Sequence, residues 1–199
     1  MKSLILSTLI LLSAPVLDLE QISIGDKAPA SNLKMANLDG LETSLDELKM
    51  ENGLCVIFSC NSCPYVLAWE DRYNEIQGIC KSNKVGFVLV NSNEARRDGV
   101  DSMEEMKAHA KDKGYGDYAY VIDENHNLAD AFGATKTPDV FLFNGDLNLV
   151  YKGAIDDNKK DKNMVLKPYL KKAIDGMTRG QKIDPASTKA VGCSIKRVS

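Results

Sequence analysis

The sequence predicts an α/β fold in which one mixed sheet carries helices on both faces. Three observations support this prediction: short apolar runs typical of buried strands, helical patterns between those runs, and one hairpin signal near the end of the series. The order is strand, helix, strand, helix, strand, helix, then a hairpin and a closing helix. Such an order places the strands in one layer and the helices above and below it.

The first elements of this series are the clearest. Ser44 and Glu47 form a capping-box pattern that predicts a short helix. Residues 54–58 are continuously apolar, as expected of a strand buried on both faces, and residues 85–90 repeat that pattern. Between these two strands, apolar residues recur every three or four positions, which predicts one helix. Its inner face is expected to be Val66, Trp69, Tyr73, Ile76 and Cys80.

The second half of the series continues the alternation. Ser102 and Glu105 predict a capped helix that ends near Gly114. A strand, a short helix and a strand are expected at residues 118–122, 125–132 and 140–143. Asn144-Gly145 predicts a tight turn into a hairpin strand. A last helix should carry Leu166, Leu170, Ala173 and Met177, with Pro168 in its first turn.

Length and composition indicate one soluble domain. The 199 residues are 27% charged and 44% hydrophobic, which is enough apolar material for one core. The net charge of −3 argues against nucleic acid as a partner, because such binding needs a clustered basic excess. We found no repeat or linker, so we expect one domain over residues 22–178 and a C-terminal extension over residues 179–199.

The N-terminal residues have the pattern of a secretory signal. Lys2 is followed by an almost wholly apolar run over residues 4–12 and then by small residues. The run is too short to span a bilayer, so no membrane span is expected in the mature protein. We therefore expect residues 1–17 to be a signal peptide and the protein to be exported to the periplasm or beyond the cell. An N-terminal core element is the alternative.

Two of the cysteines carry the chemical signal. The sequence Cys60-Asn61-Ser62-Cys63-Pro64 follows the first buried strand and opens the next helix. Two thiols at this spacing can form a disulfide, and the free N–H groups of a helix start stabilise a thiolate. We expect Cys60 to be the exposed nucleophile and Cys63 the more buried resolving thiol. An inert disulfide is one alternative.

A zinc site is a further alternative for this pair, but the chain has no second CxxC, and His109 and His126 are not at a ligand spacing. We therefore expect neither a metal nor another cofactor. The chain has an odd number of cysteines, so they cannot all pair within it. They are Cys55, Cys60, Cys63, Cys80 and Cys193.

These features resemble the thioredoxin superfamily, and within it the redoxin branch of AhpC/TSA-like and peroxiredoxin-like proteins. The resemblance covers residues 24–151. It rests on the CxxC of residues 58–64 at a strand-to-helix junction, on Thr137-Pro138 before the last hairpin, and on an extra strand–helix unit between them. The resemblance implies a thioredoxin-like fold with a cis-proline loop, in which Thr137 and Pro138 bind the extended chain of a substrate.

The sequence also departs from these relatives. A peroxiredoxin would have its peroxidatic cysteine at Cys63, preceded by a hydroxyl residue and a proline; Cys60 and Val56 occupy those positions here. The buried aspartate of thioredoxin has no counterpart, and Glu70 is a weak alternative as proton acceptor. Asn61 and Ser62 place no positive charge between the thiols, which favours a reductant or isomerase over a strong oxidant.

The sequence therefore predicts an exported thiol-disulfide oxidoreductase that cycles Cys60 and Cys63. Its expected partners are protein thiols and disulfides and an upstream electron donor. An atypical thiol peroxidase and a metallocentre-assembly module are the alternatives. Cys55 and Cys80 are expected to be core residues. Cys193 follows Gly192 in the tail and could be a third redox thiol, pair with Cys55 or Cys80, link two chains or be idle.

Overall fold

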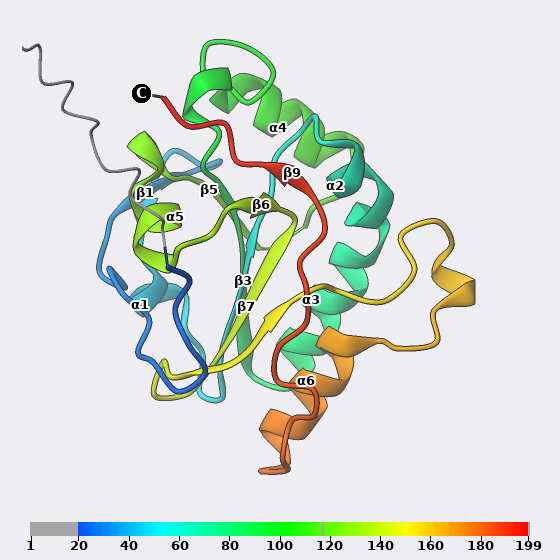
Figure 1. Cartoon of the computed structure of the whole chain (residues 1–199). Coiled ribbons are helices and arrows are strands. Elements are labelled where there is room, and N and C mark those ends of the chain that lie inside the picture. Colours follow the sequence, from blue (N-terminus) through cyan, green and yellow to red (C-terminus); the bar gives the residue numbers. More distant parts are fainter. Residues whose placement is uncertain (1–19, 117, 199) are drawn as a thin grey trace, which may run out of the picture.

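A computed structural model of the chain describes residues 20–116 and 118–198; the expected signal peptide, residues 1–17, lies outside them. The α-helices are α1 (Leu45–Leu48), α2 (Pro64–Trp69), α3 (Tyr73–Ser82), α4 (Met103–Asp112), α5 (Asn127–Phe132) and α6 (Tyr169–Thr178). The strands are β1 (Met35–Asn37), β2 (Glu42–Thr43), β3 (Gly53–Phe58), β4 (Val85–Asn91), β5 (Ala119–Ile122), β6 (Lys136–Thr137), β7 (Asp139–Asn144), β8 (Leu149–Gly153) and β9 (Cys193–Ser194). Figure 1 shows their arrangement.

The strands form a seven-stranded mixed sheet and a separate two-stranded ladder. Four strands lie in the order β2-β1-β5-β4 and three in the order β3-β7-β8. The two sets join where the Asn52 N–H donates to Lys84 O (2.9 Å) and the Ser59 N–H donates to Val90 O (2.8 Å). The pairing of β4 with β5 is parallel, and that of β3 with β7 is antiparallel. The predicted mixed sheet is therefore confirmed.

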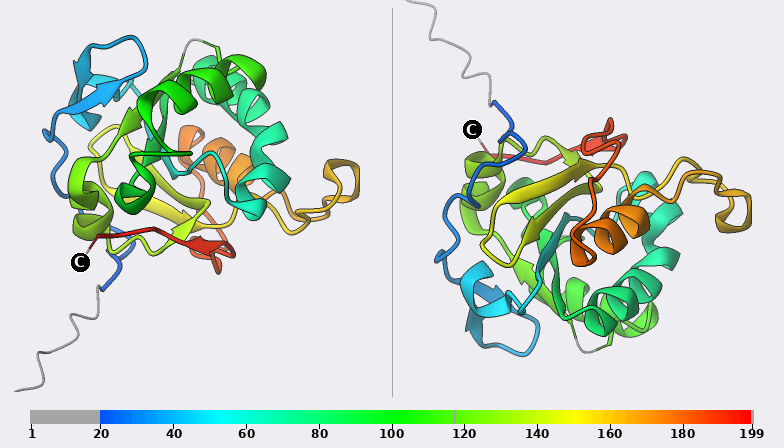
Figure 2. Two further views of the ribbon diagram at one scale, coloured as in Figure 1. Left: turned by 90° about the horizontal axis from the view of Figure 1, so that it is seen from above. Right: turned by 90° about the horizontal axis from the view of Figure 1, so that it is seen from below.

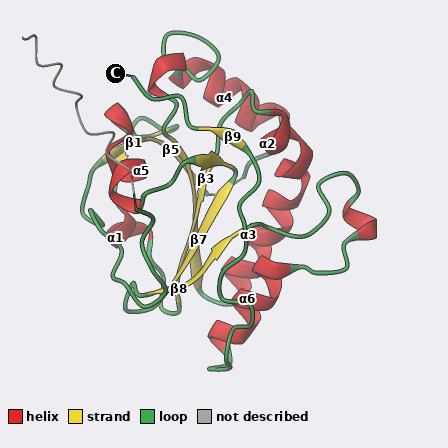
Figure 3. Cartoon of the chain, in the orientation of Figure 1, coloured by secondary structure: helices red, strands yellow, loops and turns green. Residues whose placement is uncertain are grey.

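Helices cover both faces of the sheet, as Figures 2 and 3 show. Side chains of β3 alternate between two apolar clusters, because successive residues of a strand point to opposite faces. Cys55 and Ile57 join the cluster that contains residues of α2, α3, α4 and α6. Val56 and Phe58 join the cluster that contains residues of α1 and α5. All of β3 is buried, so Cys60 follows a strand that is packed on both faces.

Three predicted elements differ in detail. The helix after Cys63 is interrupted by a 3-10 turn at Glu70–Arg72, although its predicted inner face is buried. The last helix begins only at Tyr169, after its N-cap Pro168, and Leu166 is 82% exposed outside it. The hairpin after Asn144 has a four-residue loop before β8 instead of a tight turn. Loop geometry depends on tertiary contacts, which sequence patterns do not report.

The C-terminal residues pack onto the domain. After α6 the chain runs back along β8, where the Lys152 N–H donates to Ala186 O (3.1 Å) and the Thr188 N–H donates to Lys152 O (2.9 Å). It then crosses to β6, with which β9 forms an antiparallel ladder. The red ribbon in Figure 1 follows this path. Among the described residues, no helix has the length and apolar character that crossing a membrane requires.

Candidate active site

Cys60 and Cys63 lie at the junction between β3 and α2. The strand ends at Phe58, and α2 begins after Cys63, its N-cap, with Pro64 in the first turn, where a missing N–H costs no hydrogen bond. Both cysteines are free thiols. Cys60 is 2% exposed and Cys63 is 4% exposed. The expectation that Cys60 is exposed and Cys63 buried beneath it is therefore wrong, because other parts of the chain cover both.

Thr137 contacts both sulfur atoms. The Thr137–Pro138 peptide bond is cis, as the resemblance implied. The Cys63 thiol, when protonated, donates to Thr137 O at 3.2 Å, and the Cys60 Sγ lies 3.6 Å from Thr137 Oγ1. Thr137 itself is 1% exposed. The cis-proline loop thus lies directly against the dithiol, where the resemblance places the substrate-binding backbone.

The surroundings of Cys63 favour its thiolate. Hydrogen bonding from the Cys60 thiol lowers the pKa of Cys63 to about 4, against the opposing effect of burial. The Cys193 thiol and the backbone N–H groups of Val66 and Cys193 lower it further. These donors outnumber the single acceptor, Thr137 O. The same interaction raises the pKa of Cys60, because its proton is held toward Cys63 and because Cys60 is buried.

A buried polar network lies behind Cys60. The Asp101 carboxylate accepts hydrogen bonds from the Asn61 N–H (2.9 Å), Asn91 Nδ2 (2.9 Å) and Asn93 Nδ2 (3.0 Å). Asp101 is completely buried, and its charge also raises the pKa of Cys60. Sequence patterns did not predict a role for Asp101. The polar run that follows the apolar part of β4, Asn91-Ser92-Asn93, was the available signal, since buried polar side chains need partners.

Glu70, the weak alternative for the proton acceptor, has other partners. Its Oε2 accepts hydrogen bonds from His109 Nε2 (2.8 Å) and from the Tyr115 hydroxyl (3.2 Å), and Lys113 Nζ lies 3.0 Å from its Oε1. These groups hold the carboxylate toward α4. The acidic group whose charge acts on the dithiol is therefore Asp101, which raises the pKa of Cys60, and not Glu70.

Cys193 lies at the dithiol and away from the other two cysteines. It is the partner of Thr137 in the ladder between β6 and β9, and its thiol neighbours Cys63. Cys55 and Cys80 are wholly buried and contact each other, as expected of core residues. The alternative that Cys193 pairs with Cys55 or Cys80 is therefore wrong. Cys193 is partly buried, although it belongs to the predicted C-terminal extension.

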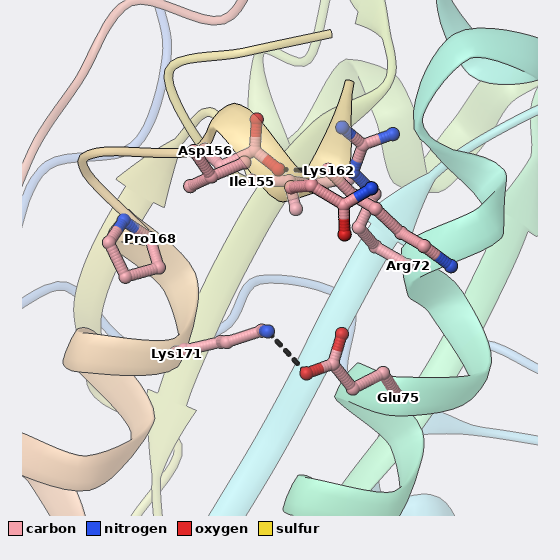
Figure 4. Close-up of a pocket in the computed structure, with 9 residues that line it drawn as sticks. Arg72, Glu75, Ile155, Asp156, Lys162, Pro168 and Lys171 are labelled. Carbon is pink, nitrogen blue, oxygen red and sulfur yellow. Dashed lines mark hydrogen bonds and ion pairs between the residues drawn. The ribbon is translucent and has the colours of Figure 1, made fainter. Parts of the chain in front are cut away.

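A separate cleft of about 270 Å³ lies between α6 and the loop that follows β8 (Figure 4). Four of its charged groups form two ion pairs, Arg72 with Asp156 and Lys171 with Glu75. Asp156 also accepts a hydrogen bond from Trp69 Nε1 (2.8 Å). This cleft has no cysteine in its lining. Its contacts instead anchor the helical segment whose start carries Cys63.

Within the described ranges, His, Cys, Asp and Glu side chains form no group of three or more that could hold a metal ion. The family model described as Redoxin matches residues 23–167. The chain belongs to the redoxin family. A comparison with curated proteins gives no match.

Two solved structures share this redoxin's fold over nearly its whole length. One is a hypothetical protein from Sinorhizobium meliloti, with 28% identity over 90% of this chain and 97% of that chain and a TM-score of 0.81. The other is an uncharacterized conserved protein from Geobacillus kaustophilus, with 30% identity over 94% and 98% of the two chains and a TM-score of 0.82. Peroxidoxin BcpB from Mycobacterium tuberculosis, at 12% identity over 80% and 98%, has the same fold with a TM-score of 0.59.

Proposed function

We propose that this redoxin is a thiol-disulfide oxidoreductase in which Cys60 and Cys63 exchange electrons with the disulfides and thiols of other proteins. One observation carries the proposal: two neighbouring free thiols at a helix start both contact Thr137, beside a cis-proline bond. Thiol-disulfide exchange needs a stabilised thiolate, a second thiol within reach and a backbone against which a substrate chain can align. The two thiols would supply the first two, and the Thr137 backbone would supply the third when β9, the strand paired with it, moves away.

The contacts support Cys63 as the attacking thiolate. Its sulfur attacks one sulfur of a substrate disulfide, and the other substrate sulfur leaves and takes up a proton. The Cys60 thiol then loses its proton and attacks Cys63, which releases the second substrate thiol and leaves a Cys60–Cys63 disulfide. Two electrons pass to the substrate, and an upstream donor restores the dithiol. This assignment reverses the roles expected from sequence, because the thiolate-stabilising donors surround Cys63.

The test is dithiothreitol-driven reduction of insulin disulfides. Cys63→Ser is expected to abolish catalysis above the uncatalysed rate. With Cys60→Ser and Cys193→Ser combined, a mixed disulfide between Cys63 and the substrate should accumulate. Cys80→Ala, at a buried cysteine away from the site, is the matched control and should keep its activity. Undiminished catalysis by Cys63→Ser, with its fold confirmed by circular dichroism, would refute the assignment.

The direction of exchange depends on the stability of the dithiol form. Donors to the Cys63 thiolate stabilise that form, which raises the reduction potential. We therefore expect a potential above the value of about −270 mV typical of thioredoxin. This expectation differs from the reductant role that the sequence favoured. The sequence has no positive charge between the thiols, but neutral hydrogen-bond donors stabilise the Cys63 thiolate instead. Equilibration with glutathione buffers measures the potential, and a value at or below that of thioredoxin contradicts the argument.

A thiol peroxidase activity is the second candidate, favoured by the thiolate at Cys63. In that reaction Cys63 attacks one peroxide oxygen, an alkoxide or hydroxide leaves and takes up a proton, and a sulfenic acid forms. The Cys60 thiol then condenses with it, and water leaves. Stopped-flow mixing of the reduced protein with hydroperoxide tests this activity. Rapid, stoichiometric consumption supports it, and a rate no faster than that of free cysteine contradicts it.

We also propose that the protein is exported, from the signal-peptide pattern of residues 1–17. Its substrates would then be exported proteins, in a compartment where disulfides persist. The test is fractionation of cells that express the full chain, with N-terminal sequencing of the mature protein. Recovery of the uncleaved chain in the cytoplasm would contradict export.

A further inference from the structure

The protein's own C-terminal strand occupies the edge of the cis-proline loop. β9 pairs antiparallel with β6, with Lys136 opposite Ser194 and Thr137 opposite Cys193. The Ile195 N–H extends this ladder by donating to Thr135 O (3.1 Å). The backbone edge at which the resemblance places a substrate chain is therefore already paired, and Figure 1 shows β9 lying beside β6.

The tail is anchored on both sides of this ladder. Ile195 is 5% exposed and belongs to the cluster beneath α5. Arg197 Nε donates to Asp130 (2.7 Å), and its Nη2 donates to Ala134 O (2.7 Å). Ile195 and Arg197 hold β9 in register. If the strand moved, Ile195 would lose its apolar contacts and Arg197 would lose both hydrogen bonds.

A chain of hydrogen bonds connects the C-terminal tail to the CxxC loop. The Lys196 N–H donates to Asn93 Oδ1 (2.8 Å), and Asn93 Nδ2 donates to Asp101 (3.0 Å). Asp101 in turn accepts the Asn61 N–H, between the two active-site cysteines. Asn93 and Asp101 are both buried, so the tail and the dithiol loop share one set of hydrogen bonds.

Gly192 lets the tail approach the cis-proline loop closely. A Cβ atom at this position would lie 2.2 Å from Thr137 O and 2.6 Å from Thr137 C, which are backbone atoms that cannot move aside. Only glycine fits this contact. The residue after it, Cys193, is thereby held opposite Thr137 with its thiol next to Cys63, where a substrate sulfur would have to lie.

We propose that Cys193 is a third redox thiol, and that residues 192–197 act as an internal substrate strand that moves the disulfide from Cys60–Cys63 to Cys63–Cys193. This inference rests on the proposed function, which supplies the oxidant as a substrate disulfide. Cys193 loses its proton and attacks Cys63 Sγ, the bond between Cys63 and Cys60 breaks, and Cys60 leaves and takes up a proton. No electrons are gained or lost in this step, since one disulfide replaces another.

This exchange gives the site two oxidised forms with different chemistry. In one, the Cys60–Cys63 disulfide can react with an incoming thiol once the tail has left the position now held by Cys193. In the other, the Cys63–Cys193 disulfide ties the tail over the site and leaves Cys60 as a thiol. An external protein can reach Cys63 only when the tail strand leaves β6, so the tail competes with substrates for the same backbone edge.

The experiment uses the purified full chain, with oxidised glutathione as the probe. Reduced Cys60→Ser is exposed to about 0.1 mM oxidised glutathione, quenched with acid and mapped by peptide mass spectrometry. Cys63 first gains glutathione, and Cys193 should then displace it. A neighbouring thiol has an effective concentration of the order of mM or more, so the adduct should be at least about tenfold less abundant than in the variant that also carries Cys193→Ser.

The matched control moves the thiol by one residue. Cys193→Ser combined with Ser194→Cys, in the Cys60→Ser background, keeps the number of thiols but points the new one to the opposite face of β9. It should retain the glutathione adduct. Cys60→Ala serves as a second background should the serine variant fold poorly, and the wild-type chain should yield both disulfide-linked peptides.

The outcomes separate this inference from the proposed function. An adduct as abundant in Cys60→Ser as in the double variant overturns the role of Cys193, even if insulin reduction is normal. A closed Cys63–Cys193 disulfide supports it, even if insulin reduction fails. Gly192→Val tests the covering strand: alkylation of Cys63 by iodoacetamide should accelerate at least tenfold, and an unchanged rate overturns the claim that the tail covers the site.

Discussion

Asp139 allows a quantitative test of how burial of a carboxyl group beside the proposed active site changes the stability of the fold. It follows the cis-proline, begins β7 and is 1% exposed. Gln21 Nε2 donates to its Oδ2 (3.1 Å), but its Oδ1 has no hydrogen-bond partner among the described residues. Burial raises the pKa of this carboxyl from 3.8 to about 8, although the charge of Lys152 opposes the shift.

The sign and size of the effect follow from linkage. Below about pH 4 the carboxyl is protonated in both the folded and unfolded chains, so burial of the charge costs nothing. As the pH rises toward 8, the unfolded chain ionises first, and folding loses stability over that window. Four pKa units at 1.36 kcal/mol each give a ceiling on the order of 5 kcal/mol. Above pH 8 the loss is complete and constant.

Asp139→Asn should remove this pH dependence while keeping an oxygen for Gln21. We expect urea unfolding at pH 9, in the presence of a reductant, to show the variant more stable than wild type by about 2 kcal/mol or more, with the gain shrinking toward pH 4.5. The control is Asp98→Asn, at an exposed aspartate. Parallel pH profiles for wild type and Asp139→Asn would refute the reasoning.

Three further predictions concern the Cys63 thiolate at the start of α2, the buried ion pair between Arg72 and Asp156, and the contact of Gly53 with β7. The thiolate absorbance of the reduced protein at 240 nm should persist down to about pH 4 and be lost in Cys63→Ser; a transition near pH 8 would contradict this. Asp156→Ala should cost about 3 kcal/mol in urea unfolding, because Arg72 loses its buried partner and keeps only the half-exposed Asp71, and Trp69 Nε1 loses its acceptor; a loss below about 1 kcal/mol would contradict burial of the pair. Gly53→Ala should cost about 3 kcal/mol or more, since φ is +136° and the new Cβ would lie 2.0 Å from Phe143 O; wild-type stability would contradict that contact.

Local patterns were sufficient for the main elements of the fold. Continuous apolar runs predicted β3 and β4, because a strand covered on both faces has no polar side to show. Ser44 and Ser102 marked two helix starts, and both bond as predicted: the Ser44 N–H donates to Glu47 (3.0 Å), and the Ser102 hydroxyl accepts the Glu105 N–H (3.2 Å). Such signals involve residues within four positions of each other, so the sequence states them directly.

Four short strands escaped prediction for the same reason. β1, β2, β6 and β9 are two or three residues long, too short for a period to be visible. β9 pairs with a segment more than fifty residues earlier, and neither segment is a strand without the other. Long-range pairing of this kind depends on how the chain returns after α6.

By itself, the sequence determined the α/β class, the redoxin resemblance, the CxxC at a helix start and the Thr137-Pro138 loop. Each of these features can be recognised from residues that are close together in the sequence. Only the tertiary structure decided which sulfur favours the thiolate, that Asp101 lies behind Cys60, and that Cys193 returns to Cys63. Those properties depend on burial and on donors brought together from distant parts of the chain, and no spacing in the sequence encodes such distances.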